Sequence, residues 1–212
     1  KRQPSVQRFS PFNPTSPYST SVIGGSGYFD GSGDYLDSGD QTAFNLSGGV
    51  YTLEAWIYPS GVYSTYGTII NKRVTSSPNS SYDLILTTGT GVLSFYASNS
   101  YLSSGVAPTP NAWNHVAAVF DGTNINLYMN GTRVLQSACP NTNYASNLCV
   151  GGYSGGEAFQ GYISNARVTK GGQLYTGTTY TIPTAPLTTS VSAGTVSLLC
   201  NMTNGAIYDS SM

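Results

Sequence analysis

The sequence between Gly24 and Val168 alternates short runs rich in Val, Ile, Tyr, Leu and Thr with clusters of Gly, Asn, Ser and Asp. Such spacing is typical of a β-sandwich or barrel, and no stretch sustains the helical period of about 3.6 residues. Asp121-Gly122 and Asn130-Gly131 separate alternating runs, and both dipeptides favour tight hairpin turns because they tolerate positive φ. The pattern predicts an all-β, antiparallel β-sandwich with almost no helix.

Individual strands follow from the same alternation. In Tyr51–Tyr58, Leu53 and Ile57 share one face of a strand, and Glu54 belongs to the other, outward face. Trp113–Phe120 is apolar on both faces, which predicts a central strand covered on each side. Further strands are expected at Tyr82–Leu86, Val92–Ala97, Ile125–Met129, Phe159–Val168 and Val196–Met202. In Phe159–Val168, we expect one face to carry Tyr162, Ser164, Ala166 and Val168.

The two ends of the chain differ in composition from its middle. Residues 1–21 contain four prolines, which remove backbone donors, and this predicts an extended arm or linker. Residues 22–169 form the expected core domain, and residues 170–195 are a second Gly-, Thr- and Pro-rich arm that returns along it. Residues 196–212 are either a final strand or the start of a following repeat.

The charge of the chain excludes two classes of function. Only 8% of the residues are charged and the formal net charge is -1. This balance is incompatible with a basic stripe that binds nucleic acid, and it gives no attraction to anionic membranes. No apolar run approaches the roughly 18–20 residues that span a bilayer, so we expect no membrane insertion.

Four segments in order carry a family resemblance: GSGYFDGSGDYL (25–36), YTLEAWIYP (51–59), WNHVAAVFDGTNINLYMNG (113–131) and FQGYISNARV (159–168). Together they resemble a laminin-G-like jelly roll of the concanavalin A-like lectin/glucanase superfamily. The resemblance implies a single jelly-roll domain with extended N- and C-terminal arms.

A narrower resemblance concerns KGGQLYTGTTYTIPTAPLT (170–188), which is similar to laminin-G-like modules of marine bacteriophage, especially cyanophage, structural proteins. In those proteins the modules can occur in tandem. Residues 197–212 also resemble the strand and turn that open such a module. We therefore expect one module of a repeat-containing virion protein; the alternative is a single domain whose last strand completes its own sheet.

Catalysis finds little support in the sequence. Glycoside hydrolysis normally needs two paired carboxylates, and the only glutamates are Glu54 and Glu157. The E-x-D-x-x-E signature of laminarinase-like relatives is absent. The aspartates that fall in Gly/Ser-rich turns, where they cap backbone donors, are Asp30, Asp34, Asp37 and Asp40. We expect Glu54 to be a solvated or salt-bridged strand residue and the protein not to be an enzyme.

The remaining chemistry-bearing residues leave alternatives open. His115 alternates with Trp113 on a strand without a nucleophile elbow, so a structural role is expected. Cys139 and Cys149 either close a short disulfide loop or remain buried thiols with Cys200, and none of the three suggests a zinc site.

Calcium is a further open question, because the FDGSGD turn places Asp30 and Asp34 beside flexible glycines. Ca²⁺ is the one cofactor we consider, and the favoured interpretation is two ordinary turn aspartates.

Carbohydrate binding requires aromatic faces with nearby polar groups, and the loops supply both. The expected ligand-binding residues are Tyr63, Tyr66, Tyr101, Tyr144, Tyr153, Asn99, Asn141 and Asn143. Tyrosine on a rigid scaffold also suits recognition of another protein.

The function expected from these features is a non-enzymatic structural or adhesive module on the virion surface, in a phage tail fibre or capsid-surface protein. Weak glycan contacts would be multiplied by repetition of the module. Its partners would be further copies, neighbouring repeats or virion proteins, and host surface glycans. The alternatives are a self-assembling cement or filament subunit without a sugar ligand, and a secreted bacterial adhesin or carbohydrate-binding module that is extracellular or on the cell surface.

Overall fold

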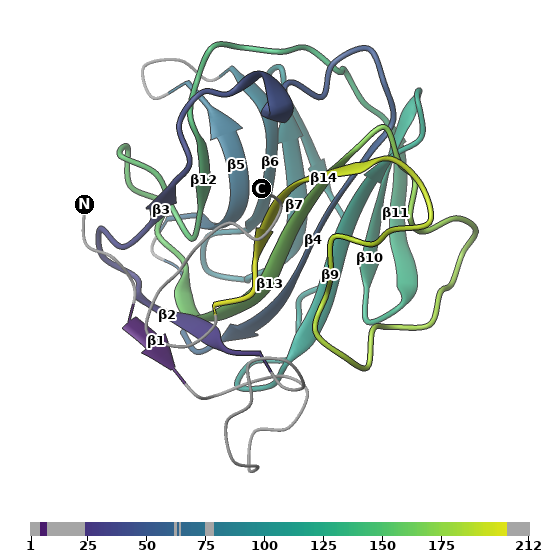
Figure 1. The fold of residues 1–212 in the computed structure, drawn as a ribbon. Helices are drawn as coiled ribbons and strands as arrows, with labels where there is room; N and C mark the ends of the chain where they lie inside the picture. The colour runs from purple at the N-terminus through teal and green to yellow at the C-terminus, as the bar shows by residue number, and fades with distance from the viewer. Residues whose placement is uncertain (1–4, 8–23, 62, 64, 75–78, 203–212) are drawn as a thin grey trace.

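The computed structural model describes residues 5–7, 24–61, 63, 65–74 and 79–202. Two antiparallel sheets face one another as a sandwich (Figure 1), which confirms the predicted all-β class. In these ranges the helical structure is a single 3₁₀ turn, η1 (Thr42–Phe44). None of the described helical segments is long and apolar enough to cross a membrane.

The larger sheet has eight strands. Its strands in spatial order are β1 (Ser5–Gln7), β2 (Ser26–Asp30), β13 (Gln160–Lys170), β4 (Tyr51–Pro59), β9 (Asn114–Phe120), β10 (Asn124–Met129) and β11 (Thr132–Ala138). The eighth strand, β14 (Thr195–Cys200), also pairs with β13. The expected final strand is therefore present at residues 195–200, whereas residues 203–212 lie outside the described part of the chain.

The smaller sheet has six strands. They follow the order β3 (Leu36–Asp37), β12 (Leu148–Val150), β5 (Gly67–Arg73), β6 (Ser80–Leu86), β7 (Leu93–Ala97) and β8 (Ser100–Ser103). The predicted hairpin with the Gly-Thr-Gly turn is the β6–β7 pair, in which Leu86 faces Leu93.

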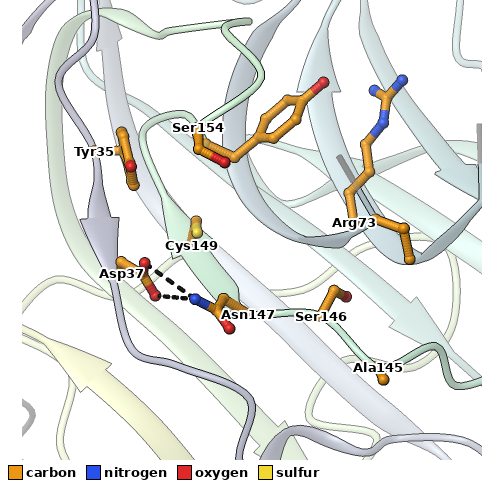
Figure 2. Close-up of a pocket in the computed structure, with 10 residues that line it drawn as sticks. Tyr35, Asp37, Arg73, Ala145, Ser146, Asn147, Cys149 and Ser154 are labelled. Carbon is orange, nitrogen blue, oxygen red and sulfur yellow. Dashed lines mark hydrogen bonds between the residues drawn. The ribbon is translucent and has the colours of Figure 1, made fainter. Parts of the chain in front are cut away.

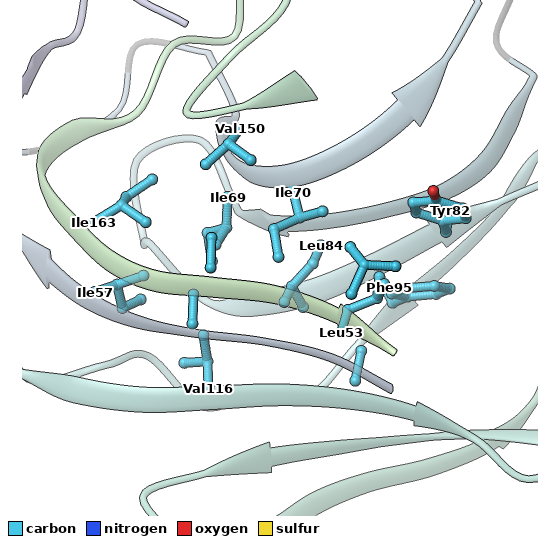
Figure 3. Close-up of a cluster of buried hydrophobic side chains, with 14 of the residues drawn as sticks. Leu53, Ile57, Ile69, Ile70, Tyr82, Leu84, Phe95, Val116, Val150 and Ile163 are labelled. Carbon is cyan, nitrogen blue, oxygen red and sulfur yellow. The ribbon is translucent and has the colours of Figure 1, made fainter. Parts of the chain in front are cut away.

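The hydrophobic core fills the space between the two sheets (Figure 3). Both sheets contribute fully buried side chains, among them Leu53, Ile57, Ile70, Leu84, Phe95 and Val116. Burial of such a side chain contributes roughly 1.5–3 kcal/mol, so this layer is the main source of stability. The inward residues alternate along strands such as β4 and β9, as the sequence predicted.

Strand β9 is central, as its apolar composition predicted. It pairs with β4 on one side and β10 on the other, and all seven of its residues are buried. Ala117 and Val119 point away from the sandwich core and pack with Tyr128, Tyr175 and Tyr180. The return arm therefore covers the outer face of β9, which agrees with the cover on both sides that its apolar composition predicted.

The two predicted tight turns differ in the structure. At Asn130-Gly131 both residues have positive φ, 48° and 82°, as a type I′ hairpin requires. At Asp121-Gly122 only the glycine does, with φ 102°. The carboxylate of Asp121 instead accepts hydrogen bonds from the backbone N–H groups of Thr123 and Asn124, which stabilises a wider turn.

Two other expectations were wrong. A bulge at Asn165, where φ is 53°, shifts the alternation in β13, so Ala166 and Val168 join the core without Tyr162 and Ser164. Within the predicted N-terminal arm, Ser5–Gln7 form strand β1, which pairs with β2. The rest of that arm lies outside the described residues.

Candidate functional site

A continuous row of side chains crosses the outer face of the six-stranded sheet. The strand register places them side by side, one per strand, in the order Asp37, Cys149, Asn71, Asp83, Tyr96 and Tyr101. Their chain neighbours Val150, Ile70 and Leu84 belong to the core between the sheets. Because successive side chains of a strand point to opposite faces, the row points away from the core. We call these six residues the outer row.

One end of the outer row opens into a cavity of about 250 Å³. Its lining includes Tyr35, Asp37, Arg73, Asn147 and Cys149 (Figure 2). Tyr153 also lines it. Within the cavity wall, Nδ2 of Asn147 donates to both oxygens of Asp37, at 2.9 and 3.1 Å. The backbone N–H of Gly39 donates to the same carboxylate at 2.9 Å, so its position is fixed.

Arg73 joins the cavity to the rest of the outer row. Its Cζ atom lies 5.6 Å from the ring centroid of Tyr96 and 5.5 Å from that of Tyr153, within cation–π range. Its Nη1 donates to Oε2 of Glu157 at 2.7 Å and lies 3.5 Å from Oδ2 of Asp83. The guanidinium thus aligns two tyrosine rings and faces two carboxyl groups.

The loop between β12 and β13 places Tyr153 and Glu157 over this sheet. A tight turn closes when the N–H of Gly156 donates to the carbonyl of Tyr153 at 3.0 Å, and Thr68 N–H donates to the Glu157 carbonyl at 3.0 Å. Gly151 begins the loop with φ 82°, and a Cβ atom there would overlap the ring of Phe29. Only glycine fits this close approach.

Burial shapes the electrostatics beneath the cavity. Desolvation raises the pKa of Asp83 well above its ordinary value, although the charge of Arg73 opposes the shift. Burial also raises the pKa of Glu157, against the charge of Arg73, and it raises the pKa of Tyr153 to about 12. Both amide atoms of Asn71 are buried, and no described residue forms a hydrogen bond with them. Water or a ligand is needed to satisfy such groups.

The other end of the outer row is aromatic and accessible. Tyr101 is 44% exposed, and its hydroxyl lies 3.2 Å from Oγ of Ser94. The rings of Tyr101 and Tyr66 have centroids 6.4 Å apart. We call Tyr153, Tyr96, Tyr101 and Tyr66, which follow one another across this face, the aromatic strip.

The structure brings together part of the expected ligand-binding set. Tyr66, Tyr101 and Tyr153 belong to the aromatic strip, and Asn99 accepts a hydrogen bond from the Tyr96 hydroxyl at 3.2 Å. Tyr144 directly precedes two cavity-lining residues, and its hydroxyl donates to Oγ of Ser98 at 3.3 Å.

Three expected residues lie elsewhere. Tyr63 is 5% exposed and belongs to the core, which contradicts its expected place on a loop surface. Nδ2 of Asn141 donates to the carbonyls of Leu46 and Gly49, so this side chain fastens two segments together. Asn143 has a buried side-chain oxygen. None of the three contributes to the aromatic strip.

Arg73, Tyr96 and Glu157 belong to the site but were not among the ligand-binding residues expected from the sequence. The alternation in Leu93–Ala97 could have shown that Tyr96 points away from the core, because Phe95 points into it. Arg73 and Glu157 are far apart in the sequence, and only the placement of the β12–β13 loop makes them neighbours.

The Cys139–Cys149 disulfide is not formed, and both residues are buried thiols, as is Cys200. Cys139 belongs to the core, and its Sγ donates to the carbonyl of Pro140 at 3.3 Å. Cys149 points the opposite way, into the outer row. The two thiols therefore lie on different faces, which corrects the disulfide alternative.

The turn at Asp30 and Asp34 uses its carboxylates for backbone hydrogen bonds. Asp34 accepts the N–H of Asp30 at 3.3 Å, and Asp30 accepts the N–H of Ser32 at 2.7 Å. Among the described residues, no group of three or more His, Cys, Asp or Glu side chains is arranged to hold a metal ion.

Glu54 and His115 form part of a separate, buried cluster under the return arm. Both side chains are fully buried, and Oε2 of Glu54 lies 3.3 Å from Nε2 of His115. The Tyr175 hydroxyl donates to the same Glu54 oxygen at 2.6 Å, and Arg167 donates to the other oxygen. The face expected to be outward is thus salt-bridged and enclosed.

Comparison with known proteins places this fold among lectin-like sandwiches. A domain of a Bacteroides ovatus protein described as a candidate carbohydrate binding protein superimposes with a TM-score of 0.61 at 18% identity, over 90% of this chain and 56% of that one. A second similar structure is domain 4 of an extracellular arabinanase of glycoside hydrolase family 43 from Geobacillus stearothermophilus, in complex with arabinotriose. It superimposes with a TM-score of 0.54 at 16% identity, over 79% of this chain and 82% of that one.

A third similar structure is tailspike protein 2 of a bacteriophage of Escherichia coli O157:H7, with a TM-score of 0.50 at 15% identity, over 82% of this chain and 27% of that one. This chain therefore spans about half of the first relative and about a quarter of the tailspike. No curated protein matches the sequence. The family model described as concanavalin A-like lectin/glucanases superfamily, of the Laminin_G_3 type, matches residues 30–171. Since this match covers more than half of the chain, the protein belongs to the concanavalin A-like lectin/glucanases superfamily.

Proposed function

We propose that this chain is a non-catalytic carbohydrate-binding module of a virion-surface protein. The observation that carries the proposal is the aromatic strip, which leads from an exposed tyrosine at β8 to a polar cavity at β12. Sugar rings present C–H faces that pack on aromatic rings, and hydroxyls that need hydrogen-bond partners. The aromatic strip supplies rings for the C–H faces, and the cavity supplies hydrogen-bond partners for the hydroxyls.

The cavity fits the end or a side branch of a glycan. Its volume of about 250 Å³ is below the roughly 300–1,000 Å³ of sites that enclose a drug-sized ligand. Asp37, Asn147 and Ser146 contribute polar groups to its wall, while Tyr35 and Tyr153 contribute rings. A longer glycan would extend from the cavity along the strip toward Tyr101.

The positions of the carboxylates support a non-enzymatic role. Glycosidases place two carboxyl groups about 5–9.5 Å apart on either side of the scissile bond. Glu54 is fully buried against Arg167 and Tyr175, where a substrate would have to displace the return arm. Asp83 is fully buried beneath the guanidinium of Arg73, which also pairs with Glu157, so these two carboxylates cannot lie on either side of a glycosidic bond.

The location on a virion rests on two likenesses. Residues 170–188 resemble modules of marine phage structural proteins, and the fold resembles a domain of the phage tailspike protein described above. The partners in this proposal are further copies or neighbouring virion proteins, and host surface glycans. A secreted adhesin would use the same face, so the site and the location need separate tests.

Affinity electrophoresis of the purified chain in gels that contain different polysaccharides, including arabinan, tests the binding site. At least one polysaccharide should retard the protein, and Tyr101→Ala should weaken that interaction up to about tenfold, since one stacked ring contributes roughly 0.5–1.5 kcal/mol. Tyr28→Ala is the matched control, because Tyr28 is 36% exposed on the other sheet. No retardation by any polysaccharide, or an equal loss in both variants, would contradict the proposal.

Immunogold electron microscopy of the native source material tests the location. Label on capsids or tail fibres is the expected result. Label on cell surfaces or free filaments would overturn the virion assignment and favour an adhesin or a self-assembling fibre.

A further inference from the structure

Four neighbouring residues on the outer face of β5 and β6 carry buried polar atoms without hydrogen bonds. Among the described residues, no hydrogen-bond partner exists for Oγ1 of Thr68, either side-chain polar atom of Asn71, Nε of Arg73 or either carboxyl oxygen of Asp83. Thr68, Asn71 and Asp83 are fully buried. We call these four residues the β5–β6 polar cluster.

The strand register gathers the cluster into one patch. Asn71 is directly opposite Asp83, whose Oδ2 lies 3.5 Å from Nη1 of Arg73. Residues 69–70 both belong to the core, and a register shift occurs there, so Thr68 and Asn71 share the outer face. The unpaired atoms are therefore neighbours on one face of the sheet.

Burial without partners is unfavourable for such groups, and folded proteins rarely leave several of them together. Water or a ligand normally satisfies them. The cluster adjoins the cavity of the proposed site: Arg73 lines that cavity, and Cys149, which also lines it, is directly opposite Asn71 in the strand register (Figure 2). A ligand in the cavity is thus close to the unpaired atoms.

Three contacts hold the β12–β13 loop against the cluster. The backbone N–H of Thr68 donates to the carbonyl of Glu157 at 3.0 Å, and Nη1 of Arg73 donates to the Glu157 carboxylate at 2.7 Å. The ring centroid of Tyr153 lies 5.5 Å from Cζ of Arg73. Movement of this ring and of the guanidinium is enough to expose the cluster to the cavity, because both side chains already line it.

A hydroxyl group matches the hydrogen-bonding capacity of the cluster. The amide of Asn71 both donates and accepts, and so does the hydroxyl of Thr68. The carboxyl group of Asp83 accepts when ionised and also donates when protonated. Since a sugar hydroxyl donates one hydrogen bond and accepts others, it can pair with each of these groups, whereas a methyl group would leave them unsatisfied.

We propose that the β5–β6 polar cluster is a second, covered subsite of the glycan site, which receives a hydroxyl-bearing group of the bound sugar when Tyr153 and Arg73 move aside. The inference rests on the proposed function, because it adds ligand-binding residues to the same site. Asn71 is the central residue of this subsite, since both polar atoms of its amide are unpaired.

Asn71→Leu tests the subsite, because leucine has a similar size and shape but no polar atom. Affinity electrophoresis in gels that contain arabinan, galactomannan or mixed-linkage β-glucan measures binding, and urea denaturation measures stability. For each polysaccharide that retards the wild-type chain, the variant should bind about tenfold or more weakly. Its urea midpoint should not fall, since the substitution removes an unpaired buried amide.

Thr68→Val is a second test that does not depend on the folding of Asn71→Leu. It removes one unpaired hydroxyl with little change of shape and should weaken binding about threefold. Unchanged affinity in both variants, beside retardation that Tyr101→Ala weakens, would overturn this inference and leave the proposed function standing. The cluster would then hold water alone.

Asn126→Leu is the matched control. Asn126 is also buried, in β10 of the other sheet, but its amide is paired with Asp121 and Arg133. This substitution should lower the urea midpoint and leave the affinity unchanged. An equal loss of affinity in Asn126→Leu and Asn71→Leu would overturn the inference, because the effect would not be specific to the cluster. Failure of every polysaccharide to retard the wild-type chain would overturn the proposed function and this inference with it.

Discussion

The guanidinium of Arg167 and the carboxylate of Glu54 form a buried ion pair between β13 and β4. Nε and Nη2 of Arg167 both donate to Oε1 of Glu54, at 2.9 and 2.7 Å. The second carboxylate oxygen accepts the hydroxyl of Tyr175 at 2.6 Å. Because Tyr175 belongs to the return arm, this one carboxylate fastens the arm to the sheet that it covers.

Replacing Glu54 by Gln should lower the free energy of unfolding by about 3 kcal/mol at pH 7, because Arg167 would remain buried without its anion. Burial alone would raise the pKa of Glu54, but the hydrogen bond with His115 and the charge of Arg167 outweigh it and lower the pKa below 4.5. A carboxylate with a lowered pKa stabilises the fold above its unfolded value, and the stabilisation is lost as pH falls through the folded pKa. Urea denaturation should therefore show a difference at pH 7 that shrinks below about pH 4.5.

Glu157→Gln is the control for this prediction, because it changes the other glutamate at a half-buried position. Burial raises the pKa of Glu157, so its ionised form is not strongly favoured by the fold. We expect a change of less than about 1 kcal/mol. An equal decrease in the free energy of unfolding of the two variants would show that Glu54 has no special role.

Asp83→Asn should stabilise the protein at neutral pH. Desolvation raises the pKa of Asp83 well above 3.8, so the folded state disfavours the ionised carboxylate more than the unfolded state does. Stability attributable to this group is therefore present below the unfolded pKa and falls as pH rises toward the folded pKa. Asparagine does not titrate, so the variant should gain about 1 kcal/mol or more at pH 7 and less at pH 4. Urea denaturation across this range checks the sign, and a variant less stable at every pH would contradict it.

Gly151→Ala should destabilise the fold and disturb the cavity. The new Cβ would overlap the ring of Phe29, in a backbone conformation with φ 82° that L side chains rarely adopt. Strain and overpacking together should reduce the free energy of unfolding by about 2–4 kcal/mol. Gly39→Ala, at φ 75° with no atom within 4 Å of the added Cβ, isolates the backbone contribution and should cost about 1 kcal/mol. Thermal unfolding of both variants separates the two effects, and equal losses would show that contact with Phe29 is unimportant.

Local pattern was sufficient for most of the sandwich. The alternation in Tyr51–Tyr58 and the apolar run Trp113–Phe120 identified β4 and β9. The order of apolar and polar residues along a strand indicates whether one or both of its faces are buried. Asn130-Gly131 likewise has the backbone conformation that its residue types favour. By contrast, Asp121 adopts a wider turn, since its side chain caps backbone donors instead.

Contacts between segments that are distant in the sequence could not be predicted from local residue patterns. Glu54 was expected on an outward face, but the return arm buries it through Tyr175. The alignment of Arg73 with Tyr96 and Tyr153 depends on the register of three strands and on a loop near residue 157. Tyr63 sits in a loop and still points into the core, which loop position alone does not indicate. The sequence could thus indicate that tyrosines form the binding surface, but it could not indicate which tyrosines lie together in the aromatic strip.

Removal of calcium should leave the melting temperature unchanged within about 1 °C. The carboxylates of Asp30 and Asp34 already accept backbone N–H groups of their own turn, which favours structural turn aspartates over metal ligands. If the turn did bind Ca²⁺, a concentration one hundred times the Kd would stabilise the fold by roughly 2.7 kcal/mol, a shift of several degrees. Thermal unfolding with 1 mM added Ca²⁺ and with excess chelator distinguishes the two cases. A calcium-dependent rise that disappears in Asp34→Asn would establish a metal site at this turn and contradict the prediction.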